Sequence, residues 1–274
     1  MNDTDQAAEG SDLDPEVSPP DTGEPPKRER YVLRKDEPEG NRRGGAPPAR
    51  WLYFHGLGSS PRSSKAAFFR SKFNALSIPF DVPDLTVPDF EHLTVTEMLG
   101  AVDRIFRDQI DDRERVGIIG SSLGAIVALW TAARHTNVRR LLLLAPAFGL
   151  FRETFLGLGR AGVNAWEKRG YTHLYHHAAG GKQRISSDFL LDARGYDESK
   201  LRLSIPITIV HGQRDEVVDP TLSTEYARRR DKVKLRLVDD DHSLLLSTTE
   251  IWDVLWHEIR YRSSARNKPQ NGST

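Results

Sequence analysis

Residues 116–130 read Val-Gly-Ile-Ile-Gly-Ser-Ser-Leu-Gly-Ala-Ile-Val-Ala-Leu-Trp, and this stretch predicts a strand, a tight turn and a helix in direct succession. The apolar run Val116–Ile119 is typical of a strand buried on both faces, and the apolar run after Gly124 predicts a buried helix. Between them, Gly120–Gly124 fits the G-x-S-x-G pattern of a nucleophile elbow, with Ser122 at its centre. Such a turn strains the central serine, so glycines are needed where a Cβ would collide with backbone.

The same alternation of strands and helices continues on both sides of this turn. Predicted strands cover Trp51–Phe54, Pro79–Val82, Val116–Ile119, Leu141–Leu144, Ile207–Val210 and Lys234–Val238. Predicted helices cover Ser63–Leu76, Val95–Gln109, Leu123–His135, Leu222–Arg229 and Thr248–Tyr261, with capping boxes at Thr94/Glu97 and Ser247/Glu250. This order predicts the α/β class, with a mostly parallel sheet covered by helices on both faces.

The chain divides into one predicted domain and two flanking segments. Residues 50–264 form the α/β domain, and residues 148–197 within it exceed the length that a crossover needs, which predicts a small cap-like insertion. Residues 1–49 are acidic and proline-rich with few aliphatic side chains, so we expect a disordered extension. We expect residues 265–274 to form a disordered tail.

The composition excludes several classes of protein. The chain has 274 residues with 39 basic and 39 acidic side chains, a balance that gives no reason to expect a nucleic-acid partner. It has no cysteine, which excludes disulfides and a thiol nucleophile and suits a reducing compartment. A secretory signal is not visible, and the longest apolar run, Leu141–Phe151, is too short to span a membrane. We therefore expect a soluble, cytoplasmic protein.

A serine hydroxyl is a weak nucleophile, so Ser122 requires a histidine as base and an acid that orients the histidine. For a nucleophile elbow the expected chain order is serine, acid, histidine. Asp215 follows the predicted strand Ile207–Val210, and His242 follows the last predicted strand. All three residues therefore fall at the carboxyl ends of strands, where open α/β sheets place their sites.

Other carboxylates compete with Asp215 for the role of the acid. Asp219 precedes Pro220 and a predicted helix, so its better interpretation is a helix N-cap. Asp239–Asp241 adjoin His242 and are expected to bend the loop, although one of them remains an alternative acid. Asp215 is our first choice.

An oxyanion hole needs two backbone amides that point at the developing negative charge. The amide of Leu123, directly after the nucleophile, is expected to supply the first. The second is expected from Leu57, because its loop leaves the first predicted core strand. We expect Gly56 and Gly58 to belong to the same oxyanion and substrate-binding part of the site, and we assign no catalytic role to His55.

Three further patterns have plainer interpretations. Gly157–Gly162 fits a dinucleotide-binding fingerprint but lies inside the insertion, far from a strand. His173, His176 and His177 could share one face of a helix, but no further ligand recurs at metal spacing. His257-Glu258 lacks the second histidine of a zinc-protease helix. The sequence therefore predicts neither a cofactor nor a metal.

Four motifs together resemble the α/β-hydrolases, and in particular the compact bacterial YqiA-like serine esterases. They are Tyr53–Pro61 with Lys65-Ala66, Gly120–Gly124, His211-Gly212 through Asp215–Val218, and Asp241-His242. The resemblance covers roughly residues 50–261 and implies the same nucleophile, acid, base and oxyanion donors, namely Ser122, Asp215, His242, Leu57 and Leu123. Ala125 stands where these esterases often have a second glycine, and the extension and insertion exceed the compact pattern. The resemblance therefore leaves the substrate open.

These residues predict hydrolysis of a small carboxylic ester, or as second choice a thioester, through an acyl-enzyme on Ser122. Because His242 must be neutral to act as a base, activity is expected to rise through roughly pH 6 to 7. A non-catalytic ligand-binding or scaffold protein of the same fold remains the alternative. The acidic extension could dock a protein partner under either hypothesis.

Overall fold

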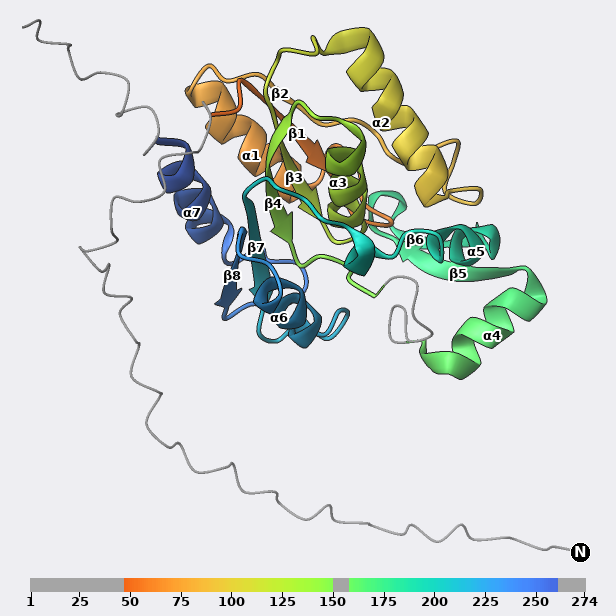
Figure 1. Cartoon of the computed structure of the whole chain (residues 1–274). Coiled ribbons are helices and arrows are strands. Elements are labelled where there is room, and N and C mark those ends of the chain that lie inside the picture. The colour runs from red at the N-terminus through yellow and green to blue at the C-terminus, as the bar shows by residue number, and fades with distance from the viewer. Residues whose placement is uncertain (1–46, 150–157, 261–274) are drawn as a thin grey trace, which may run out of the picture. The chain divides into compact units, whose positions relative to one another are not determined.

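The structure is a computed structural model that describes residues 47–149 and 158–260. Six strands form one sheet in the order β2-β1-β3-β4-β7-β8, and each pair of neighbours runs parallel (Figure 1). These strands are β1 (Arg50–Phe54), β2 (Phe80–Asp81), β3 (Val116–Ser121), β4 (Val138–Leu144), β7 (Ile207–Gly212) and β8 (Val233–Val238). The helices around the sheet are α1 (Ser64–Ala75), α2 (Val95–Gln109), α3 (Leu123–Arg134), α6 (Pro220–Arg228) and α7 (Thr248–Arg260).

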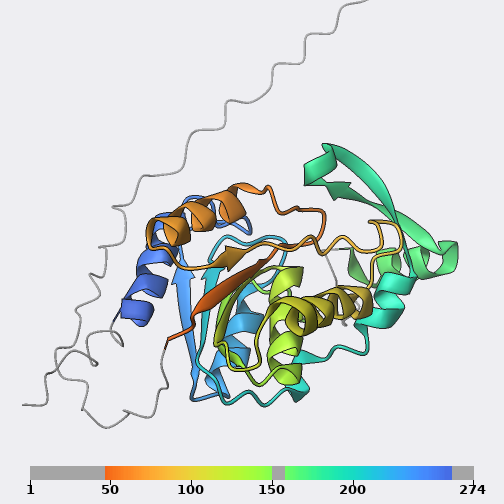
Figure 2. The ribbon, with the colours of Figure 1, turned by 90° about the horizontal axis from the view of Figure 1, so that it is seen from above.

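The sheet lies between two layers of helices (Figures 1 and 2). On one face, Phe73 of α1 and Trp252 of α7 pack with Trp51 of β1. On the other face, Leu99 of α2 and helices α3 and α6 pack with Leu52 of β1. Neighbouring residues of a strand thus serve opposite cores, which explains why the strands read as nearly continuous apolar runs. The predicted α/β class with helices on both faces is confirmed.

The strands and helices differ from the predicted ranges mainly at their ends. β2 is shorter than predicted, because Pro79 and Pro83 on either side cannot donate to a strand ladder. β4 begins three residues before the predicted start, since Val138 already pairs with Val116 ahead of an irregularity in the register.

Local caps explain where two helices, α2 and α6, begin. The amide of Glu97 donates to Thr94 Oγ1 at 3.1 Å, which confirms the predicted start of α2. Asp219 caps α6 as predicted, by accepting a hydrogen bond from the amide of Thr221 at 2.8 Å. A capping box before α7 would require Glu250 to accept from the amide of Ser247. That prediction is wrong, because the Ser247 amide donates to Asp240 Oδ2 at 2.8 Å and Glu250 pairs with Arg236.

Between β4 and β7 the chain forms an insertion with its own elements. They are α4 (Gly159–Arg169), β5 (Tyr171–His176), η2 (His177–Ala179), β6 (Gly181–Ser186), α5 (Asp188–Ala193) and η3 (Glu198–Lys200). β5 and β6 pair antiparallel in a separate two-stranded sheet, seen at the right of Figure 2. The buried rings of Trp166 in α4 and Phe189 in α5 stack with centroids 6.3 Å apart, so the insertion packs around apolar side chains.

Several predicted boundaries fall outside the described residues. These are residues 1–46 of the predicted extension, residues 150–157 of the insertion, the end of the domain at 261–264 and the tail at 265–274. The last three residues of the predicted extension do have a described position. The amide of Ala49 donates to the Arg115 carbonyl at 2.7 Å, and Arg115 Nε donates to the Pro47 carbonyl at 3.0 Å. Residues 47–49 therefore lead directly into β1.

Candidate active site

Ser122 lies in the turn between β3 and α3, and its backbone has the left-handed φ of 54° with ψ of −117°. A Cβ on Gly124 would lie 2.2 Å from the carbonyl oxygen of Phe54, and a Cβ on Gly120 would lie 2.5 Å from the carbonyl oxygen of Gly124. The amide of Ser122 donates to the Leu144 carbonyl at 2.9 Å, which holds the strained turn on the sheet. Both glycines are therefore sterically required, as the G-x-S-x-G pattern predicts.

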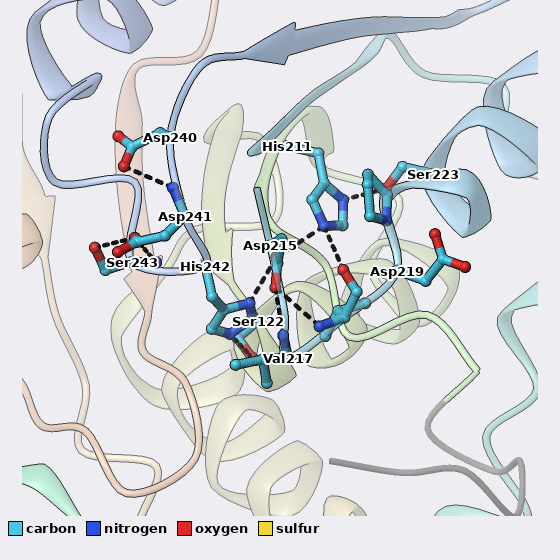
Figure 3. Close-up of polar contacts among 12 residues, drawn as sticks. Ser122, His211, Asp215, Val217, Asp219, Ser223, Asp240, Asp241, His242 and Ser243 are labelled. Carbon is cyan, nitrogen blue, oxygen red and sulfur yellow. Dashed lines mark hydrogen bonds and ion pairs between the residues drawn. The ribbon is translucent and has the colours of Figure 1, made fainter. Parts of the chain in front are cut away.

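His242 reaches Ser122 from the loop after β8. Its Nε2 lies 3.0 Å from Ser122 Oγ, and its Nδ1 lies 2.8 Å from Asp215 Oδ2 (Figure 3). Because a carboxylate can only accept, Nδ1 carries the ring proton and Nε2 faces the serine hydroxyl as an acceptor. The His242 side chain is 24% exposed and that of Asp215 is 0% exposed, so the chain of hydrogen bonds runs from the interior to an accessible hydroxyl. The structure brings together the three residues that the sequence singled out.

The carboxylate of Asp215 is buried with donors on both oxygens. Oδ1 accepts from the amides of Val217 and Val218, each at 2.9 Å, and Oδ2 accepts from His242 and from His211. Burial raises the pKa of Asp215, but the hydrogen bonds from both histidines and from Val218 outweigh that effect and hold the pKa below its ordinary value. Asp215 is therefore a fixed negative charge beside His242.

The other candidate acids have different partners. Asp239, in the loop after β8, pairs with Arg214 at the surface. Asp240 is buried and accepts from the amides of Asp241 and Ser247 at 2.8 Å each, which shapes the loop that carries the histidine. Asp241 Oδ1 accepts from the Ser243 amide at 2.7 Å. These carboxylates bend the loop, as expected, and the acid in contact with His242 is Asp215.

His211 contacts the site, although its sequence pattern did not predict a role there. This buried side chain at the end of β7 places Nε2 2.9 Å from Asp215 Oδ2 and Nδ1 2.7 Å from Ser223 Oγ (Figure 3). The motif His211-Gly212 is visible in the sequence, but a histidine inside an apolar strand end looks like an ordinary core residue. A Cβ on Gly212 would lie 2.4 Å from the Asp240 carbonyl oxygen, so the close approach of the two loops requires glycine here.

The loop after β1 lies against Ser122. A Cβ on Gly56 would lie 3.1 Å from Ser122 Cβ, so Gly56 borders the nucleophile. Leu57 follows Gly56 and packs partly buried on the core, and Leu123 begins α3 directly after the serine. Gly58 lies against the insertion, because its Cβ would lie 2.7 Å from the Tyr175 carbonyl oxygen. Gly58 has a φ of 67°, so it lets the loop turn beneath the β5–β6 hairpin.

His55 fixes the orientation of one peptide in this loop. Its Nε2 accepts from the amide of Leu85 at 3.1 Å, so the ring proton is on Nδ1, which donates to the Gly56 carbonyl at 3.0 Å. Burial lowers the pKa of His55, although the Gly56 carbonyl and Asp84 oppose this effect. The ring therefore stays neutral and holds the Gly56 carbonyl on its own side. The N–H of the same peptide unit, which belongs to Leu57, points the opposite way.

The histidine and glycine patterns that resembled metal or dinucleotide sites in the sequence do not form such sites in the described residues. His173 and His176 lie on strand β5 and His177 begins η2, so the helix considered for these histidines is wrong. Within the described ranges, no group of three or more histidine, aspartate or glutamate side chains could hold a metal ion. The dinucleotide-like pattern ends inside α4, and its first glycine, Gly157, lies outside the described residues. His257 lies in α7.

A parallel sheet with helices on both faces, together with a strained serine turn at a strand end, defines the α/β-hydrolase fold. The chain belongs to the uncharacterised protein family UPF0227, whose sequence model matches residues 50–256. A search among curated proteins finds no match. In the part of the chain that the structure describes, no helix has the length and apolar character to cross a membrane.

Solved structures of other proteins share this fold at low sequence identity. Alpha/beta hydrolase domain-containing protein 10 from mouse is 24% identical with a TM-score of 0.63, over 78% of this chain and 92% of its own. Est1E from Butyrivibrio proteoclasticus, solved with ferulic acid bound, is 18% identical with a TM-score of 0.63, over 82% and 93%. The monoacylglycerol lipase of Paleococcus ferrophilus is 16% identical with a TM-score of 0.60, over 80% and 97%.

Proposed function

We propose that the protein is a serine hydrolase that cleaves a small carboxylic ester, or a thioester, through an acyl-enzyme on Ser122. The observation that carries this proposal is the continuous hydrogen-bond chain from Ser122 Oγ through His242 to Asp215. A buried acid, a histidine of fixed tautomer and a strained, accessible serine have no use in a protein that only binds a ligand. The name of one solved example of the fold, a monoacylglycerol lipase, agrees with this chemistry.

The reaction follows from the positions of the protons. His242 Nε2 accepts the proton of Ser122 Oγ as the oxygen attacks the acyl carbon, and Asp215 stabilises the imidazolium that forms. The same proton passes from Nε2 to the leaving alcohol or thiol, whose bond to the acyl carbon breaks. A water molecule then gives its proton to Nε2 and attacks the acyl-enzyme, which releases the carboxylic acid and restores Ser122. No cofactor enters these steps.

The tetrahedral intermediate needs two amide donors, and we assign them to Leu123 and Leu57. Leu123 begins a helix, so its amide is one of the free N–H groups of the helix N-terminus and suits a negative charge. Gly56 borders Ser122, and His55 Nδ1 donates to the Gly56 carbonyl, which fixes the orientation of the peptide between Gly56 and Leu57. We propose that the amide of Leu57, which points away from that carbonyl, faces the nucleophile.

The proposal is tested by hydrolysis of a series of p-nitrophenyl esters and acyl thioesters of increasing chain length. Ser122→Ala should lower kcat/KM by on the order of 10³-fold or more, because only binding and the oxyanion donors remain. Ser64→Ala, which removes an exposed hydroxyl in α1, is the matched control and should keep wild-type turnover. If a folded Ser122→Ala variant retained turnover, Ser122 would be ruled out as the nucleophile.

A further inference from the structure

A second serine–histidine pair lies on the other side of Asp215. Ser223 Oγ is 2.7 Å from His211 Nδ1, and His211 Nε2 is 2.9 Å from the same Oδ2 atom that accepts from His242. Figure 3 shows the two imidazole rings on opposite sides of the carboxylate. One oxygen atom therefore receives two ring N–H groups, one from the accessible pair and one from a pair whose histidine is 0% exposed.

The proton positions in the inner pair follow from its partners. His211 Nε2 faces two acceptors, Asp215 Oδ2 at 2.9 Å and the Val218 carbonyl at 3.1 Å, so it must carry a hydrogen. In the neutral ring Nδ1 is then an acceptor, and the buried hydroxyl of Ser223 donates to it. A serine that donates to Nδ1 polarises the ring and strengthens the N–H bond to Asp215.

We propose that His211, held by Ser223, is a positioning residue that sets both the orientation of Asp215 and its strength as an acceptor for His242. This inference rests on the proposed function, because it assigns a role to the partner of the catalytic acid. The Val217 and Val218 amides fix Oδ1, and His211 fixes Oδ2, so the carboxylate has no freedom to rotate away from His242. The pair thus supplies part of the preorganisation that the triad needs.

Sharing the oxygen also has an electrostatic consequence. The His211 N–H draws negative charge from Oδ2, which weakens the pull of that atom on the Nδ1 proton of His242. Without His211, Oδ2 interacts with His242 alone. Its preference for the imidazolium over the neutral ring is then greater than in the wild type. The histidine then keeps its second proton to a higher pH, and the fraction of enzyme with a free base at a given acid pH falls.

A merely structural histidine would affect folding but not the titration of the site, and this difference gives the test. His211→Leu removes the shared donor, and His211→Gln places an amide nitrogen near the position of Nε2. Ser223→Ala weakens the donor without removing it. The matched control is His135→Leu, because His135 also pairs with a carboxylate, Asp103 at 2.7 Å, but at the opposite end of α3 from Ser122.

We expect His211→Leu to lower kcat by about 10-fold or more at its optimum with little change in KM, and to move the acid limb of the kcat/KM profile upward by about half a pH unit or more. Ser223→Ala should move the limb in the same direction by a smaller amount. His211→Gln should return it toward the wild-type position, and His135→Leu should leave it unchanged. An acid limb that stays in place in folded His211→Leu and Ser223→Ala variants would overturn the inference.

A titration of the His242 ring by ¹⁵N NMR gives the same answer without a substrate. The midpoint should rise in Ser223→Ala and in His211→Leu relative to wild type, and an unchanged midpoint in both would contradict the proposal. Labelling of wild-type Ser122 by a fluorophosphonate tests the proposed function separately. If the midpoint shifts in the variants but wild-type Ser122 is not labelled, the role of His211 stands and the proposed hydrolase function is rejected. If Ser122 is labelled but the midpoint does not shift, the hydrolase function stands and the role of His211 is rejected.

Discussion

Asp215 Oδ2 accepts a hydrogen bond from Nδ1 of His242 at 2.8 Å, across 27 residues of chain. The contact joins the loop after β7 to the loop after β8, two strands that pair in parallel along their full length. Because parallel neighbours end at the same edge of the sheet, the acid and the histidine meet there without any long-range adjustment of either loop.

Replacing Asp215 by Asn should reduce kcat by about 10³- to 10⁴-fold. Both oxygens of the carboxylate accept hydrogen bonds, whereas an amide has only one acceptor oxygen. Either His242 or the Val217 and Val218 amides then face an N–H group, and the histidine loses its fixed tautomer. Steady-state kinetics of Asp215→Asn against wild type measures the loss. A variant with near-wild-type kcat would show that another acid orients His242.

The same substitution should reveal a pH-dependent contribution to stability. Hydrogen bonds hold the pKa of Asp215 below its ordinary value despite burial, so the ionised form stabilises the folded state above the unfolded pKa of about 3.9 and loses this effect as the pH falls. The difference in Tm between wild type and Asp215→Asn should be largest near neutral pH and narrow below about pH 4. Thermal melts between pH 7 and pH 3 check this, and a constant difference would contradict it.

Much of this arrangement could be predicted from the sequence because the signals are local. Ser122 is identified by glycines at fixed positions around it, and Asp215 and His242 are identified by their places after apolar strands. Steric clashes at Gly120 and Gly124 are the physical basis of that pattern, so it survives in a chain with low identity to the solved examples of the fold.

The parts that could not be predicted depend on contacts between distant segments. His211 reads as a core residue until the fold places Ser223 on one side of it and Asp215 on the other. Ser247 fits a capping box in the sequence, but its amide donates to Asp240, because the loop after β8 folds back on itself. His173 and His176 are three residues apart, a spacing that fits one face of a helix, but pairing with β6 places both on strand β5.

Lys65 makes another long-range contact, and this contact leads us to expect a loss of activity at alkaline pH. Its Nζ donates to the Ser243 carbonyl at 2.7 Å, directly beside His242 and 178 residues away in the chain. Burial lowers the pKa of Lys65 to about 8, and nearby carboxylates oppose this effect (Asp240, Asp241 and Asp215). The ammonium is therefore present below about pH 8 and is lost above it, which removes the charge that strengthens this bond.

We expect wild-type kcat/KM to fall severalfold as the pH rises through about 8. Lys65→Arg, whose guanidinium stays charged, should show no decline in that interval, and Lys65→Met should be less active than wild type at pH 7 with a flat profile from there upward. Profiles of the three proteins between pH 7 and 10 measure this. A decline that persists in Lys65→Met would assign it to another group.

Two glycine substitutions should have opposite effects on stability. A Cβ on Gly124 would lie 2.2 Å from the Phe54 carbonyl oxygen, so Gly124→Ala should cost roughly 1–3 kcal/mol or more and displace Ser122. Gly100, inside α2, has open space around it, with Arg104 Nη1 at 3.8 Å as its nearest neighbour. Gly100→Ala should stabilise the protein by about 0.5–1 kcal/mol. Chemical denaturation of both variants checks the pair, and equal effects would contradict the steric account of the turn.

Labelling of the full-length protein with a fluorophosphonate, followed by peptide mass spectrometry, tests whether Ser122 is an activated nucleophile, because the probe needs no knowledge of the substrate. We expect a single adduct on Ser122, absent in Ser122→Ala and formed much more slowly in Asp215→Asn. No adduct on a folded wild-type protein, or an adduct on a different residue, would contradict the assignment of Ser122 as an activated nucleophile.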